Sequence, residues 1–390
     1  MKQTIIILFL FFSKFIYSQE LIKIKIVDSE DGKPISKARI ILLKDVLYSN
    51  DEGYVLVPST ANNFEITAYN YKTKSLKKIN NLIELTPVYK NIDEVIISNI
   101  DIKKLFSEVL KNYKKKYYNE TSVYDITYKQ KNIDDDELSF LLISKGKMWT
   151  MSNMYNYKSA FNKNYDDFIQ LEINDVKYFK NSISENEICR GQSLNQSRDF
   201  IGNLFFNYEL NRVNDYFKIE NAKYSGKIIS QSGDEQNIIF KIDSPTIIIS
   251  GNIIYDKKEK VILRYQLDYD QTNYPSYKRK SKDGLEYDFK VGNGTIYFDF
   301  YRKDNKYIPS IAGTKGFSYC TINNQKHKNS FSRELIFNKF SESKFLELTN
   351  KVDLNKRIWS NLKTSINKDD TTILLSESEK EFINEKEYEK

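Results

Sequence analysis

Residues 246–270 read TIIISGNIIYDKKEKVILRYQLDYD, and this stretch decides the fold class. Runs rich in Ile, Val and Tyr flank the charged turn DKKEK, which is the pattern of antiparallel strands joined by a short connection. The pattern repeats on both sides, because NIIFKI precedes the stretch and GTIYFDFY and SFSRELIFNKF follow it, separated by polar turns. We therefore expect a mainly β protein with a large antiparallel sheet that is long enough to curve.

An amphipathic helix is expected before this sheet. Apolar side chains between positions 102 and 117 recur at helical spacing, and they are Ile102, Leu105, Phe106, Val109, Leu110, Tyr113 and Tyr117. We also predict strands at 122–129 and 138–151, a short helix at 197–208 and a helical stretch at 346–366. These elements predict an α+β domain over residues 101–345, followed by a helical, charged tail at 346–390.

A smaller unit of short strands is expected at residues 19–90. LIKIKIV from position 21 alternates apolar and polar residues, as a half-buried strand does. Turn signals follow at Gly32, Pro34 and Gly53, and Asn70 lies between two tyrosines at a position suited to a left-handed turn. The pattern predicts a small β-sandwich, joined to the larger domain by a linker at 91–100.

The small unit resembles the carboxypeptidase regulatory-like domain. The residues that carry the resemblance are Asp28, Gly32, Lys33, Pro34, Ile35, Ala38, Asp51, Glu52, Gly53, Pro58, Tyr69, Asn70 and Tyr71, together with DEVII at 93–97. The resemblance implies a transthyretin-like sandwich that is not an enzyme and that accompanies peptidases and TonB-dependent outer-membrane receptors of Gram-negative bacteria. The strands at 251–300 are similar to uncharacterised envelope proteins that have a half-barrel like that of the lipoprotein carriers.

The first eighteen residues have the layout of a secretory signal peptide. Lys2 is followed by an apolar run and then by Ser18 at a cleavage position. We therefore expect an exported protein of the periplasm or outer membrane, with the cell surface as an alternative, and no membrane span after signal removal. In an oxidising compartment Cys189 and Cys320 can form a disulfide, whereas a buried free thiol is an equal alternative.

Groups for catalysis are scarce. The chain has one histidine and two cysteines, which excludes His-rich and Cys-rich zinc sites, and we expect no catalytic residue, metal or cofactor. Asp268 and Asp270 share a strand face and are the carboxylate pair to consider for a hydrolase, although a polar strand face is the simpler and favoured interpretation. We predict a hairpin tip at 134–137, a hairpin turn at 292–295, and an exposed loop around His327.

One loop combines aromatic and basic residues in a way that suits a ligand. It contains Tyr274, Tyr277, Lys278, Arg279 and Lys280. Stacking and charge of this kind suit a glycan or an anionic lipid headgroup, and export argues against nucleic acid as the partner. A solvated loop is the simpler alternative.

These observations favour a non-enzymatic cell-envelope protein that works as a binding or interaction module, in association with outer-membrane receptor or transport systems. Its partner would be an envelope protein, a glycan or a lipid. The first alternative is a lipid or lipoprotein carrier, with an apolar cavity between the curved sheet and the helix at 102–117. The second alternative is a carboxylate-dependent hydrolase, which requires convergent acids, one of them with a raised pKa.

Overall fold

The computed structural model is mainly β, as the strand pattern predicts. It describes residues 20–43, 45–88, 98–155, 165–183, 203–281, 284–343, 348–362 and 373–385. The chain divides into two units, one of residues 1–89 with 371–376 and one of residues 90–370 with 377–390.

The smaller unit contains two short sheets around one core. The first sheet has the order β4 (Tyr54–Pro58), β1 (Leu21–Asp28), β7 (Leu82–Leu85), and β1 pairs in parallel with β7. The second has the order β3 (Val46–Tyr48), β2 (Arg39–Ile41), β5 (Phe64–Thr67), β6 (Lys74–Leu76). Alternate side chains of these strands, including Ile24, Ile40 and Phe64, form a common buried cluster. Asn70 has the predicted left-handed conformation, with φ of 64°.

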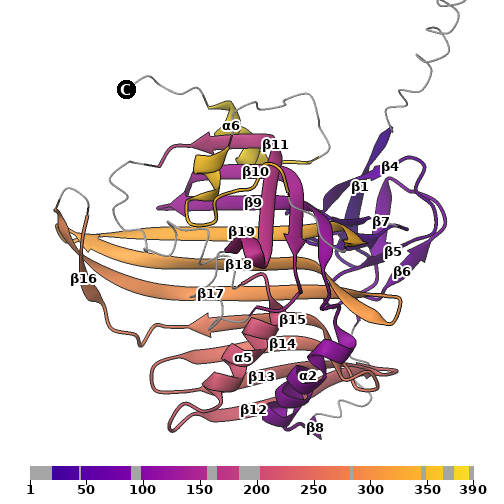
Figure 1. The fold of residues 1–390 in the computed structure, drawn as a ribbon, viewed down its shortest axis with the longest axis horizontal. Coiled ribbons are helices and arrows are strands. Elements are labelled where there is room, and N and C mark those ends of the chain that lie inside the picture. The colour runs from indigo at the N-terminus through magenta and orange to yellow at the C-terminus, as the bar shows by residue number, and fades with distance from the viewer. Residues whose placement is uncertain are drawn as a thin grey trace, which may run out of the picture. The chain divides into compact units, whose positions relative to one another are not determined.

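The larger unit is built on one 12-stranded antiparallel sheet (Figure 1). Its strands are β8 (Ser98–Asn99), β9 (Ser122–Asp134), β10 (Glu137–Thr150), β11 (Ile169–Asn181), β12 (Lys223–Ser232), β13 (Glu235–Asp243), β14 (Ile248–Asp256), β15 (Val261–Asp270), β16 (Tyr277–Lys280), β17 (Glu286–Lys303), β18 (Lys306–Ile322) and β19 (Gln325–Glu342). The order is β11-β10-β9-β19-β18-β17-β15-β14-β13-β12-β8, with β16 paired to β17. Strands β9 and β19 pair although they lie far apart in the sequence.

Two helices cover one face of this sheet, called the helix face below. Helix α2 (Ile102–Lys116) begins where the Asp101 side chain accepts a hydrogen bond from the Lys104 N–H. Helix α5 (Phe206–Tyr216) lies beside α2, and buried residues of both join the core made by β9–β11, β13–β15 and β17–β19. The opposite face carries Asp268, Thr295, Lys315 and Ser332, and it is called the open face. Helix α6 (Glu377–Asn384) lies against β10 and β11.

Three predicted elements differ from the structure. The helix predicted at 197–208 is wrong in its bounds, because α5 runs from Phe206 to Tyr216; residues 197–202 lie outside the described residues. The helix predicted at 346–366 is wrong over residues 348–357, where the Val352 N–H donates to the Leu171 carbonyl and the chain follows β11; only Ile358–Asn361 forms a 3-10 turn. The hairpin turn predicted at 292–295 lies inside β17.

Cys320 is buried beside Phe289 and is half of a disulfide. The other cysteine of the chain, Cys189, lies outside the described residues. Among the described residues, no helix combines the length and apolar character that a membrane span needs.

Candidate functional site

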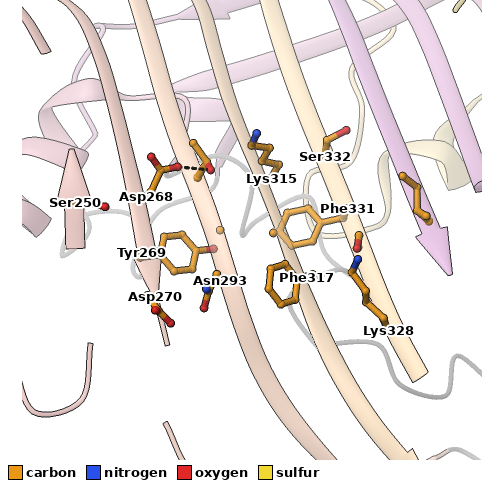
Figure 2. A pocket seen from close by; sticks show the side chains of 15 residues that line it. Ser250, Asp268, Tyr269, Asp270, Asn293, Lys315, Phe317, Lys328, Phe331 and Ser332 are labelled. Carbon is orange, nitrogen blue, oxygen red and sulfur yellow. Dashed lines mark hydrogen bonds between the residues drawn. The ribbon is translucent and has the colours of Figure 1, made fainter. Parts of the chain in front are cut away.

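The open face of β15 and β17–β19 is hollowed into a groove of about 530 Å³. This volume lies within the range of small-molecule sites. Figure 2 shows Asp268 and Asp270 on β15 at one side, with Lys315 on β18 and Lys328 on β19 at the other. The remaining lining residues are Ile133, Ser250, Tyr269, Asn293, Gly294, Thr295, Gly316, Phe317, Ser330, Phe331 and Ser332.

Strand register brings these residues together. Asp268 pairs with Thr295, Thr295 with Lys315, and Lys315 with Ser332, so the four form one row across four strands. Paired residues of antiparallel strands point to the same face, and successive residues point to opposite faces. The row therefore lies on the open face, whereas the buried Leu267 points to the helix face.

A β-bulge shapes the floor of the groove. Val291 pairs with Ser318 and Gly294 pairs with Gly316, so Gly292 and Asn293 stand opposite the single residue Phe317. An added Cβ on Gly292 would lie 2.3 Å from Cδ2 of Phe317, so the phenyl ring occupies the space that a side chain would fill. Gly292 therefore lies in a β-bulge and leaves room for the Phe317 ring. Neither Gly292 nor Gly294 forms the predicted hairpin turn.

The two carboxylates of the groove are oriented by hydrogen bonds. Asp268 Oδ1 accepts from the Thr295 hydroxyl at 2.6 Å, and its Oδ2 accepts from the Gln266 amide at 3.0 Å. Asp270 Oδ1 accepts from the hydroxyl and from the backbone N–H of Thr272, the latter at 2.8 Å. The hydrogen bonds from Thr272, with a smaller one from Asn293, hold the pKa of Asp270 below its usual value of 3.8. Asp270 is therefore ionised at neutral pH and accepts hydrogen bonds.

Lys315 contributes a positive charge to the groove. Its side chain is exposed, and within the described part of the chain no carboxylate lies within ion-pair distance of it. Lys328 differs, because its Nζ lies 3.2 Å from Asp136, a residue that is 84% exposed. The sequence does not predict either lysine as a site residue. For Lys315, no local pattern indicates that it pairs with residues 295 and 332.

Between the helices and the sheet, the described side chains around Tyr117 are closely packed. The rings of Tyr117, Phe206 and Phe300 lie within 4.9–5.7 Å of one another, measured between ring centroids. The pocket lined by these rings and by Tyr113 measures about 10 Å³, which is enough for one water molecule. This packing does not favour the carrier alternative.

The predicted contact loop lies at β16 and does not line the groove. Tyr274 and Tyr277 are 43% and 39% exposed, as a contact surface requires. Its lysines are paired with acids on β17, since Lys278 lies 3.0 Å from Asp288 and Lys280 lies 2.9 Å from Glu286. Arg279 stacks on the Phe289 ring at 4.1 Å. Ligand contact at this loop stays a prediction.

His327, the single histidine of the sequence, contacts Asp135. His327 lies in β19 and not in a loop as predicted, because β19 begins at Gln325. Its Nδ1 lies 2.8 Å from Asp135 Oδ2, and this contact helps to hold the pKa of Asp135 below its usual value. Residues 134–137 form the predicted hairpin tip, where Asp135 and Asp136 have positive φ. Among the described residues, no group of acids, His and Cys is placed to hold a metal ion.

No family model and no curated protein matches the chain. A crystal structure of a protein of unknown function from Bacteroides fragilis is similar at 7% identity, over 83% of this chain and 98% of that one, with a TM-score of 0.15. A TM-score this low carries no argument about fold or function.

Proposed function

We propose that the protein is an exported, non-enzymatic binding protein of the cell envelope, and that the open-face groove is its ligand site. The observation that carries this proposal is the lining of one 530 Å³ groove by two oriented carboxylates and by Lys315. Side chains whose charges and hydrogen-bonding groups converge on a concave surface are typical of ligand recognition. The signal-peptide pattern and the resemblance of the smaller unit support an envelope location.

The chemistry of the groove favours binding over hydrolysis. A carboxylate hydrolase needs a general acid that remains protonated near neutral pH, which requires a raised pKa. The pKa of Asp270 is lowered instead, and Asp268 accepts hydrogen bonds from Thr295 and Gln266. Both groups suit the acceptance of hydrogen bonds from a ligand.

A groove-filling substitution tests the proposal. Ser332 is a small side chain that lines the groove on β19, and Ser332→Trp should fill part of the groove while leaving every charged group in place. Ser225→Trp on the exposed strand β12 is the matched control. Low-molecular-mass material extracted from the cell envelope of the source organism is passed over each immobilised full chain, and retained compounds are identified by mass spectrometry.

We expect the wild-type chain and Ser225→Trp to retain the same compound with unchanged mass, and Ser332→Trp to retain at least about tenfold less, which corresponds to about 1.4 kcal/mol of binding free energy. Equal retention by all three chains, or by none, would contradict the proposal. Release of a chemically altered compound would contradict the non-enzymatic assignment.

A further inference from the structure

Resting on the proposed function, we infer that the ligand is an acidic polysaccharide, a chain of sugars that carry carboxylate groups. One or two sugars occupy the groove, and the chain continues along a surface called the lysine strip. The strip lies on the open face of β17–β19. It begins at Lys315, Phe317 and Lys328, which line the groove, and it continues beyond the groove to Lys290, Tyr319 and Lys326.

The register of three neighbouring strands builds this strip. Lys290 on β17 pairs with Tyr319 on β18, and Tyr319 pairs with Lys328 on β19. Phe317 and Lys315 follow on the same face of β18 at steps of two residues, which is about 7 Å along a strand. Lys326 and Lys328 lie one such step apart on β19, and Lys315 lies two steps along β18 from the row formed by Lys290, Tyr319 and Lys328.

Aromatic rings alternate with the cations along the strip. Lys326 Nζ lies 3.8 Å from the centroid of the Tyr319 ring, and Lys328 Nζ lies 5.9 Å from that of Phe317. These cation–π contacts hold the ammonium groups over the sheet without neutralising them. The rings also offer flat apolar surfaces for the apolar faces of sugar rings.

The lysine strip has a net positive charge. In the described ranges, Lys290, Lys315 and Lys326 have no carboxylate within 4 Å, and Lys328 has only the exposed Asp136. This arrangement differs from β16, where both lysines are paired with acids. Lys290, Lys315 and Lys326 can therefore bind anionic groups of a ligand without first breaking an ion pair, and Lys328 has only an exposed one to break.

The groove favours a sugar over a lipid headgroup. Asp268 and Asp270 are acceptors, so the β15 side of the groove suits donors such as sugar hydroxyls and repels anionic groups, phosphate and carboxylate alike. Thr295, Ser330 and Ser332 add hydroxyl groups that both donate and accept. A ligand that presents hydroxyls to β15 and carboxylates to β18 and β19 satisfies both sides at once.

The test uses a defined oligosaccharide and the full chain. A hexamer of galacturonic acid is titrated into the wild-type protein by isothermal calorimetry at low and high salt, with maltohexaose as the neutral comparator. The variants are Lys315→Gln and Lys290→Gln, which remove a cation without leaving a carboxylate unpaired. Lys223→Gln on the exposed strand β12 is the matched control.

We expect the acidic hexamer to bind the wild type and Lys223→Gln equally, and at least tenfold more tightly than maltohexaose. The variants Lys315→Gln and Lys290→Gln should each weaken binding about three- to tenfold, and 1 M salt should weaken it further because the Debye length falls to about 3 Å. Equal binding of maltohexaose, or no effect of either lysine substitution, would overturn the inference. Binding to phosphatidylglycerol vesicles without binding to the hexamer would also overturn it, in favour of a lipid surface.

Different results would overturn the proposed ligand class and the proposed function. If the acidic hexamer does not bind while Ser332→Trp still abolishes retention of envelope material, the ligand class is wrong and the groove remains the site. If that retention is insensitive to Ser332→Trp, the proposed function itself is wrong.

Discussion

Replacement of Phe206 by alanine is expected to lower the free energy of unfolding of the larger unit by about 3–5 kcal/mol. Phe206 is 2% exposed, and its ring lies 5.0–5.7 Å from the rings of Tyr117, Tyr265, Phe298 and Phe300, measured between centroids. Removing the ring leaves a cavity between α5 and the sheet that these large neighbours cannot collapse to fill. Each aromatic pair that is lost adds to the cost of the cavity.

Urea unfolding followed by tryptophan fluorescence measures this effect. The two tryptophans, Trp149 and Trp359, both belong to the larger unit, so their signal reports on that unit. Tyr274→Ala is the control, because Tyr274 is 43% exposed and its loss should change stability by less than about 0.5 kcal/mol. An unfolding midpoint of Phe206→Ala equal to that of the control would show that α5 does not pack on the sheet in this way.

The second large effect is expected from Glu209→Gln. The Glu209 side chain is 2% exposed, lies 2.8 Å from Arg212 Nη2, and accepts a hydrogen bond from the Tyr265 hydroxyl at 2.7 Å. Burial, together with the Glu209 carboxylate, raises the pKa of Tyr265 well above its usual value, so this hydroxyl stays protonated and donates. The substitution removes the negative charge and leaves Arg212 without its carboxylate partner.

We expect Glu209→Gln to lower the free energy of unfolding of the larger unit by about 2–4 kcal/mol, because the substitution leaves the Arg212 charge unpaired. Arg212 retains some access to water, which reduces the cost. Asp215→Asn is the matched control on the same helix, where the pair with Lys218 is exposed and contributes at most about 1 kcal/mol. The same urea experiment compares the two variants. Equal stability of both would contradict the buried pair.

The sequence predicts the elements of the fold better than their arrangement. The alternation at residues 246–270 predicts the hairpin of β14 and β15, and the spacing of Ile102, Phe106 and Tyr113 predicts α2, because both periodicities are local. The pairing of β9 with β19 joins residues about 200 positions apart, and no local pattern specifies it. The helix predicted at 346–366 failed because hydrogen bonds to β11 override a weak local preference.

The groove was only partly predictable for the same reason. Asp268 and Asp270 were identified as one strand face from their spacing of two, and both line the groove. The glycines at 292 and 294 were interpreted as a turn, because turns and bulges share glycine as a signal. Lys315 was missed because its importance comes from its neighbours on β17 and β19, whose register is a tertiary property.

Hydrogen–deuterium exchange of the full chain, with and without the envelope material that it retains, tests the central claim most directly. If the open-face groove is the ligand site, amides of β17, β18 and β19 around Gly294, Gly316 and Phe331 should exchange several-fold more slowly with ligand, whereas those of α2 should not change. Slower exchange confined to α2 and α5, with no change at the groove, would contradict the account.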